Sequence, residues 1–302
     1  MKAFIIGGAG TIGSASAFLL AKEGLCNEIV LYDTYMPMAM NHAMDMLQAV
    51  SGISGAVIRT GTLEDMADSD LVVSAFGYPR EDADKFGKRD VEMVLPIIEE
   101  VCSTLKKYAP KAVVITMTNP LDPINYMMYR LSGLSRRQFL GFSINDTLRM
   151  RWGISQYTGV PAKLIECASM GEHGASKVQI YSQAKVNGEP LRLDDKEAGI
   201  IDNIQLSFWN NYVSCNVNRT AGWTSAIGMV EIAECLTGRR SGFTICSCVL
   251  NGEYGLSGIS VGVPVFLDKN GVREIIVFDL ATDENHAFFA SADKVRAMTN
   301  MF

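Results

Sequence analysis

The sequence has no excess of positive charge and no long apolar run, and each absence excludes a class of function. Among 302 residues, 27 are Lys or Arg and 33 are Asp or Glu, so the net charge is −6. Basic pairs such as Arg136-Arg137 are isolated, whereas a nucleic-acid surface would cluster them. No stretch approaches the roughly 20 apolar residues that span a bilayer. We therefore expect no nucleic-acid partner and no membrane partner.

Cysteine is scarce, and its spacing argues against a disulfide framework. The chain has seven cysteines, and the one close pair, Cys246 and Cys248, would lie on the same face of a strand, where a mutual bridge is poorly placed. No second Cys/His pair accompanies them, so we expect no metal site. The N-terminus reaches a glycine cluster too early to be a secretory segment. These features favour reduced thiols and a cytoplasmic protein.

The composition and length of the chain are typical of a globular protein of two closely packed domains. Hydrophobic residues make up 48% of the chain and charged residues 20%. The length of 302 residues exceeds the roughly 100–200 residues of one domain. The sequence contains no internal repeat, low-complexity tract or flexible linker. We place the boundary between residues 1–143 and residues 144–302, where the pattern of strands and helices changes.

The first domain alternates short β-branched runs with helical patterns, which is typical of a parallel sheet with crossover helices. The predicted strands are Ala3–Gly7, Glu28–Tyr32, Val57–Thr60, Leu71–Phe76, Ala112–Thr116 and Phe139–Phe142. The predicted helices lie near Thr11–Glu23, Pro37–Val50, Asp90–Tyr108 and Pro123–Leu131. This alternation of six strands with helices predicts a Rossmann-type, doubly wound α/β domain of the kind that binds dinucleotides.

The second domain mixes helices and strands without that alternation, so we expect an α+β catalytic domain. Helices are predicted at Asp146–Thr158, Lys196–Arg219, Ser225–Leu236 and Asp283–Thr299. Strands are predicted at Leu164–Ser169, Val178–Ser182, Ala184–Val186, Phe243–Leu250, Gly262–Leu267 and Glu274–Val277. Asn187-Gly188, between two extended segments, predicts a tight hairpin.

A glycine pattern after the first strand predicts a nucleotide site. Gly8, Gly10 and Gly13 fit GxGxxG, and Thr11 and Ile12 within it open an amphipathic helix. Glycine permits the tight turn and lets the backbone approach a pyrophosphate, while the helix N-terminus supplies N–H groups for the phosphates. Asp33, twenty residues beyond Gly13, ends the second strand. Its carboxylate suits ribose hydroxyls and repels a 2′-phosphate, so we expect NAD as the cofactor. The alternative is a glycine-rich turn beside a surface aspartate.

Three further segments, read with the glycine pattern, resemble the lactate/malate dehydrogenase family. They are Thr118-Asn119-Pro120-Leu121-Asp122, Asn145-Asp146-Thr147-Leu148-Arg149-Met150-Arg151 and Gly171-Glu172-His173-Gly174. The resemblance runs from Lys2 to at least Ser257, and the 27 residues from Asp146 to His173 suit the Asp/His pair of that family. It implies an NAD-dependent 2-hydroxy acid dehydrogenase that acts on a small-molecule 2-oxo or 2-hydroxy acid. It also implies a homodimer or homotetramer.

The chemistry of such a reaction explains the residue types. Reducing a 2-oxo acid requires a proton at the carbonyl oxygen, and histidine, with an ordinary pKa of ~6.5, carries one at neutral pH. We therefore expect His173 and Asp146 to be catalytic, with the carboxylate favouring the imidazolium form. Arg149 lies on the same helix face as Asp146 and suits a two-pronged grip on a carboxylate. Asn119, at the carboxyl edge of the sheet, is expected to bind the substrate or the cofactor.

The resemblance also assigns roles to the segment between Gly77 and Arg89 and to one residue beyond it. Gly77 is expected to contact the cofactor, Arg80 to bind a second substrate carboxylate, and Arg89 to polarise the reacting carbonyl. Thr224 resembles a residue that lines the substrate pocket. Arg80 is typical of malate dehydrogenases, so malate and oxaloacetate are the favoured substrates.

This segment departs from the family pattern in ways that keep other substrates open. Arg80 and Arg89 are nine residues apart, which makes the loop about three residues longer than usual, an insertion that loops tolerate. Acidic residues follow Arg80, and Ala175 replaces the acidic residue that follows GEHG in the family. The longer loop resembles that of hydroxyisocaproate dehydrogenases. L-lactate or a bulkier L-2-hydroxy acid therefore remains an alternative substrate.

Simpler interpretations of the same residues also stand. His173 could be a buried core residue, and Arg149 a solvated residue on the helix surface. Asp146 could serve only as a helix N-cap, and Asn119 only as a turn residue before proline. A protein that senses NAD without turnover is the alternative function. The joint presence of His173, Asp146, Arg149 and Arg89 argues against sensing, because binding NAD alone does not require them.

Overall fold

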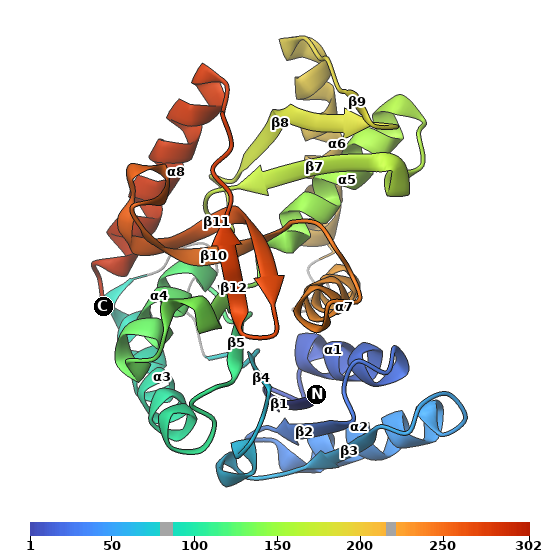
Figure 1. The fold of residues 1–302 in the computed structure, drawn as a ribbon, viewed down its shortest axis with the longest axis vertical. Coiled ribbons are helices and arrows are strands. Elements are labelled where there is room, and N and C mark those ends of the chain that lie inside the picture. Colours follow the sequence, from blue (N-terminus) through green and yellow to red (C-terminus); the bar gives the residue numbers. More distant parts are fainter. Residues whose placement is uncertain (79–86, 216–221) are drawn as a thin grey trace.

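The computed structural model describes residues 1–78, 87–215 and 222–302, and these fold around one sheet of nine strands (Figure 1). The order of strands is β12-β11-β10-β6-β5-β4-β1-β2-β3. A second sheet, β7-β8-β9, lies at the opposite end of the molecule from β1–β3 (Figure 1).

Six strands from the first half form a parallel sheet in the order 3-2-1-4-5-6. They are β1 (Lys2–Ile6), β2 (Glu28–Tyr32), β3 (Val57–Thr60), β4 (Leu71–Ser74), β5 (Val113–Thr116) and β6 (Phe139–Gly141). β4 and β5 are buried at every position, as expected of strands covered on both faces. The Rossmann-type prediction is confirmed, and the predicted strand ends differ from the observed ends by at most two residues.

Helices cover both faces of this parallel sheet. The helices are α1 (Thr11–Lys22), α2 (Met36–Val50), α3 (Lys88–Tyr108) and α4 (Leu121–Ser132). The buried residues of α1 and α2 belong to one core cluster, and those of α3 to another on the opposite face. A short helix, η1 (Leu63–Met66), precedes β4. Successive side chains along each strand therefore alternate between the two cores.

Three strands of the second half extend this same sheet. β10 (Thr244–Asn251) pairs with β6 in antiparallel register, and β11 (Ser257–Asp268) and β12 (Gly271–Ile275) follow. These strands belong to the predicted second domain, and in the structure they extend the Rossmann sheet through the pairing of β10 with β6. Gly141 permits the junction, because a Cβ there would lie 2.5 Å from that of Ser247. β11 begins five residues earlier than predicted, since Gly258 and Gly262 interrupt its pattern.

A smaller sheet and four helices complete the second half. The sheet contains β7 (Ile165–Met170), β8 (Val178–Val186) and β9 (Glu189–Pro190). The predicted runs at 178–182 and 184–186 are one strand, and the predicted hairpin is present, with positive φ at both Asn187 and Gly188. The helices are α5 (Ile144–Thr158), α6 (Asp195–Ser214), α7 (Trp223–Thr237) and α8 (Thr282–Thr299). The predicted end of α6 at Arg219 lies outside the described residues. Two short helices, η3 (Ala162–Leu164) and η4 (Glu253–Gly255), lie between these elements, and a third, η2 (Arg136–Gln138), precedes β6 in the first half.

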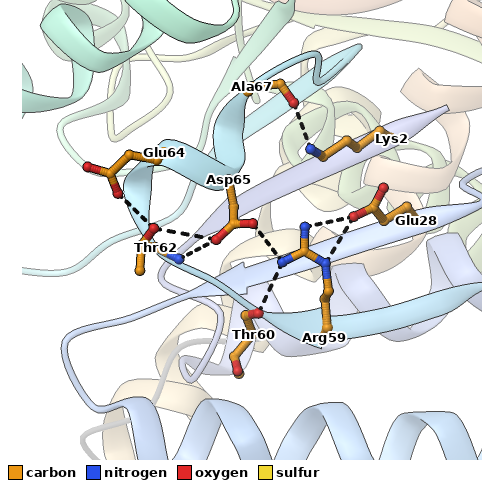
Figure 2. A network of polar contacts seen from close by, with 8 residues as sticks. All are labelled: Lys2, Glu28, Arg59, Thr60, Thr62, Glu64, Asp65 and Ala67. Atoms are coloured by element: carbon orange, nitrogen blue, oxygen red, sulfur yellow. Dashed lines mark hydrogen bonds and ion pairs between the residues drawn. The ribbon is translucent and has the colours of Figure 1, made fainter.

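The edge of the parallel sheet carries a polar network instead of an apolar cover. Figure 2 shows Arg59 of β3 between Glu28 of β2 and Asp65 of η1. The guanidinium lies 2.9 Å from the Glu28 carboxylate and 2.8 Å from that of Asp65. Asp65 also accepts the N–H of Thr62, which begins the η1 turn. The network therefore connects three consecutive elements at the outer edge.

All seven cysteines are free thiols, and only Cys215 is exposed. Among the described helices, none combines the length and the apolar character required to cross a bilayer. Within the described residues no group of three or more His, Cys, Asp or Glu is arranged to hold a metal ion.

Candidate active site and nucleotide edge

The glycine turn between β1 and α1 is packed so closely that side chains are excluded. Gly7 has φ +87°, and a Cβ there would lie 2.4 Å from the carbonyl oxygen of Ala75. A Cβ at Gly13 would lie 2.2 Å from the carbonyl oxygen of Gly7, and one at Gly8 would lie 2.8 Å from Cβ of Leu31. Gly7 was not among the predicted residues. The signal for it was the glycine doublet at the end of the first strand.

The start of α1 has the chemistry that a pyrophosphate requires. Gly10 is its N-cap and provides no capping side chain, and the first turn, beginning with Thr11 and Ile12, contains no acidic residue. The backbone N–H groups of this turn are therefore free of side-chain caps and lie at the positive end of the helix dipole. An anionic phosphate group fits this position, so the residues present fit the predicted NAD site.

Asp33, which the sequence predicts as a ribose ligand, lies beside this turn. One carboxylate oxygen accepts the N–H of Ala9 and the other accepts the N–H of Tyr35, each at 2.9 Å. Both bonds hold the carboxylate at the end of β2, next to the glycine turn. Each oxygen retains a lone pair for a further donor, which suits a hydroxyl and disfavours a phosphate.

The paired residues of the second half meet at the end of the sheet. Asp146 in the first turn of α5 lies 2.7 Å from Nδ1 of His173, in the turn that follows β7. Burial acts to lower the pKa of His173, but the charge and hydrogen bond of Asp146 outweigh it and raise the pKa above 6.5. The same interaction lowers the pKa of Asp146 against the effect of its own burial. The pair therefore favours imidazolium beside carboxylate.

Arg149 lies one helical turn beyond Asp146 and retains unused donors. Its Nη1 atom is 3.5 Å from a carboxylate oxygen of Asp146, and its guanidinium lies 5.6 Å from the ring centroid of Phe208. Its buried Nε has no hydrogen-bond partner within the described part of the chain. A half-buried arginine with a free edge beside a protonatable histidine fits a carboxylate ligand.

Asp122 is a residue of this site that the sequence interpretation missed. One of its carboxylate oxygens accepts the backbone N–H of His173 at 2.7 Å. The side chain is fully buried, and burial raises its pKa to about 6. The signal was present in the segment TNPLD, where Asp122 stands in the first turn of α4. It holds the histidine backbone, whereas Asp146 holds the ring.

The remaining predicted residues belong to the loops and helix starts beyond the carboxyl ends of the strands. Gly77 and Asn119 are exposed, and they follow the neighbouring strands β4 and β5. Thr118 connects the two loops, because its hydroxyl donates to the carbonyl oxygen of Phe76 at 2.8 Å. Arg89 is exposed in the first turn of α3. Arg80 lies outside the described residues.

Thr224 is half-buried in the first turn of α7, which begins beside the glycine turn. A Cβ at Gly222 would lie 2.8 Å from the methyl group of Thr11. Ser225 accepts a hydrogen bond from the Asn145 side chain at 2.9 Å. The start of α7 therefore lies between the nucleotide turn and the helix that carries Asp146.

Comparison with known proteins places this geometry in a family. The NAD-binding domain of lactate/malate dehydrogenases matches residues 1–141, and the alpha/beta C-terminal domain matches residues 145–301. The chain belongs to the lactate/malate dehydrogenase family. It is accordingly an NAD-dependent oxidoreductase that acts on 2-hydroxy acids, which confirms the predictions of family, cofactor and reaction class.

Relatives of the full length carry the same family assignment. The chain is 34% identical to a malate dehydrogenase of Pelagibacter ubique, covering 99% of this chain and 96% of that protein. It is 30% identical to a malate dehydrogenase of Haloferax volcanii, with 98% and 97% covered. The solved malate dehydrogenase of Cryptosporidium parvum has a TM-score of 0.89 at 27% identity, covering 99% and 98% of the two chains.

Proposed function

We propose that this family member is a malate dehydrogenase, which interconverts oxaloacetate and malate, with His173 as the proton carrier. The observation that supports this proposal is the 2.7 Å pairing of His173 with the buried Asp146, with Arg149 on the same helix face. The relatives named above are malate dehydrogenases, and this supports the choice of substrate.

His173 performs the acid–base step in this proposal. NADH supplies the hydride when it is bound at the glycine turn. The imidazolium donates a proton to the developing alkoxide oxygen of the substrate, and neutral imidazole takes the proton back in the reverse direction. Since Nδ1 faces Asp146, the proton is exchanged at Nε2. Asp146 orients the ring and stabilises its charged form.

Arg149 binds the carboxylate that every 2-oxo acid carries. Its planar group offers paired donors, and its partly buried position strengthens their attraction for an anion. Arg89 would polarise the substrate carbonyl, and Asn119 and Thr224 would line the pocket. Gly8, Gly10, Gly13, Gly77 and Asp33 would hold the cofactor. Arg80 would pair with the second carboxylate that distinguishes oxaloacetate from pyruvate.

We further propose that the protein is a cytoplasmic homodimer or homotetramer whose domains divide at residues 143 and 144. The apolar side chains on the outer face of α2 support association, because Met40 and Met44 are each about half exposed. The seven free thiols support a reducing compartment.

The decisive experiment is NADH oxidation with oxaloacetate, pyruvate and 4-methyl-2-oxopentanoate as alternative substrates. Oxaloacetate is expected to have the highest kcat/KM. Arg80→Gln is expected to lower that value about tenfold, or roughly 1.4 kcal/mol, and to change pyruvate little. A preference of the wild type for the branched acid would refute the malate proposal and leave the dehydrogenase class intact.

The site assignment has a separate test. His173→Ala is expected to lower turnover by roughly 10²–10⁴-fold. NADH binding, followed by its fluorescence, is expected to stay unchanged, because the imidazole does not hold the nucleotide. A parallel loss of nucleotide affinity would assign His173 a structural role instead.

A further inference from the structure

The turn that carries His173 is packed against the last helix of the chain. Ser291 of α8 is fully buried, and its hydroxyl oxygen accepts the backbone N–H of Glu172 at 2.8 Å. A Cβ at Gly171, where φ is +85°, would lie 2.5 Å from that same oxygen. The residue immediately before His173 is therefore bonded to a helix that lies about 120 positions later in the sequence, at 291.

A closed ring of hydrogen bonds connects Ser291 to the other end of the turn. Ser176 lies 3.2 Å from Ser291, hydroxyl to hydroxyl, and both the N–H and the hydroxyl of Ser176 donate to the carboxylate of Glu172. Because a carboxylate only accepts, the Ser176 proton points to Glu172, and Ser291 donates to Ser176. Each member of the ring then has a defined donor and acceptor role.

Two other elements hold the same turn. Gly171 exchanges both backbone hydrogen bonds with Gly262 of β11, at 2.9 Å and 2.8 Å. Asp122 of α4 accepts the N–H of His173. Of these three attachments, the one through Ser291 is made by a side chain of α8 and can be removed by deleting a single oxygen atom.

We infer that Ser291 is a positioning residue, which fixes the turn at residues 171–176 and thereby the distance between His173 and Asp146. This inference rests on the proposed role of His173 as proton carrier. Ser291 touches no reacting atom in this arrangement. It acts through the backbone of Glu172, which is bonded directly to His173.

The protonation of His173 reports on this distance. The charged groups that face the imidazole are Asp146 from α5, Asp122 from α4 and Arg149, and Glu172 and Lys177 stand in or beside the turn. Burial lowers the pKa of His173, and close contact with Asp146 is what raises it overall. A looser turn lengthens that contact, so the pKa of His173 falls toward or below its ordinary value of 6.5.

The test compares wild type with Ser291→Ala and Ser176→Ala in the full-length protein. The chain has three histidines, so NMR of isotope-labelled imidazoles resolves the titration of His173, His42 and His286. Both variants are expected to lower the pKa of His173. Turnover is expected to fall about tenfold, because the proton donor is displaced, while KM for NADH stays constant.

Ser182→Ala is the matched control for the attachment of α8. The Ser182 hydroxyl donates to Glu284 near the start of α8, away from the turn. This variant removes one hydroxyl contact to the same helix, and it is expected to leave the pKa of His173 at the wild-type value. His286 lies within α8 and reports whether the helix itself has moved.

The outcomes separate this inference from the proposed function. Both serine variants could have a lower melting temperature while the His173 titration and the kcat–pH profile stay as in wild type. That result would assign the hydrogen-bond ring of Ser291, Ser176 and Glu172 a purely structural role. If Ser291→Ala fails to fold, Ser176→Ala carries the same test from within the turn. Full turnover in His173→Ala would instead overturn the proposed function. The titration of His173 in Ser291→Ala would still report whether Ser291 positions the imidazole.

Discussion

Two buried aspartates contact His173, and their pKa values shift in opposite directions because they contact different parts of it. Burial by itself acts to raise the pKa of each carboxyl. Asp146 faces the imidazole ring, and the ring's charge and hydrogen bond lower its pKa below 3.8. Asp122 faces the backbone N–H, which carries no full charge, and its pKa remains raised at about 6. The geometry therefore assigns the charge partnership to Asp146 and the anchoring of the backbone to Asp122.

The first prediction concerns Asp146→Asn and the pH dependence of the reaction. Reduction requires imidazolium, so activity is present below the raised pKa of His173 and is lost as pH rises through it. Removing the carboxylate leaves burial and Arg149, which lower that pKa, and Asp122, whose raising effect is weaker than that of burial. We expect the pH at which reduction is half lost to move down, with a fall in kcat/KM of roughly 10²-fold or more at pH 8. The measurement is kcat/KM for oxaloacetate reduction across pH.

Malate oxidation is a control, because it requires the opposite protonation state of His173. That direction requires neutral imidazole, so its activity should extend to lower pH in Asp146→Asn. A midpoint that moves to higher pH in either direction, or an unchanged profile, would contradict the role of Asp146.

At the scale of elements, the outer edge of the parallel sheet depends on a side-chain network. β3 is the last strand of this sheet, and the Arg59 side chain joins it to β2 and η1 (Figure 2). Nε and Nη2 donate to one oxygen of Glu28, and Nη1 donates to Asp65. The Arg59 side chain is 38% exposed, so solvent weakens each pair. A network of this kind stabilises modestly, and it protects an edge by occupying it with charge.

We predict that Arg59→Met lowers the free energy of unfolding by about 0.5–1 kcal/mol. Methionine retains the apolar stem, so the loss reports the ion pairs more than packing. Urea denaturation at low salt measures it, and added salt should reduce the difference. Lys22→Met is the matched control, because the Lys22–Glu23 pair is exposed and connects adjacent residues only. An equal loss in both variants would show that the network adds nothing beyond a surface ion pair.

At the scale of the whole molecule, one sheet passes through both halves of the chain. β6 from the first half pairs with β10 from the second, through Leu140 and Gly141. A buried amide reinforces the junction: Asn125 of α4 accepts from Thr116 of β5 and donates to Ser260 of β11 at 2.9 Å. Separating the halves would expose strand edges and leave these polar groups without partners.

We therefore predict that both halves unfold in one transition. All three tryptophans, at 152, 209 and 223, belong to the second half, so their fluorescence follows that half alone. Far-ultraviolet circular dichroism follows the whole chain. At a fixed protein concentration the two curves in urea should coincide. A fluorescence transition at distinctly lower urea would indicate that residues 144–302 unfold as an independent domain.

The sequence alone determined the elements whose signals are local. The six Rossmann strands follow from short β-branched runs, the Asn187-Gly188 hairpin from its turn chemistry, and the nucleotide turn from glycine spacing after a strand. Family resemblance also brought His173, Asp146 and Arg149 together, although they come from separate elements. In the structure Asp146 contacts both His173 and Arg149.

Only the tertiary structure decided which strands pair and what surrounds the histidine. The pattern of Phe243–Leu250 predicts a strand, but the identity of its partner depends on the close approach of Gly141 and Ser247, which are far apart in sequence. Gly7, Asp122 and Ser291 were missed for the same reason. Each is defined by an atom from a distant element, namely the Ala75 carbonyl, the His173 N–H and the Glu172 N–H. Local periodicity reports which residues are buried, whereas packing between distant segments determines what each buried atom contacts.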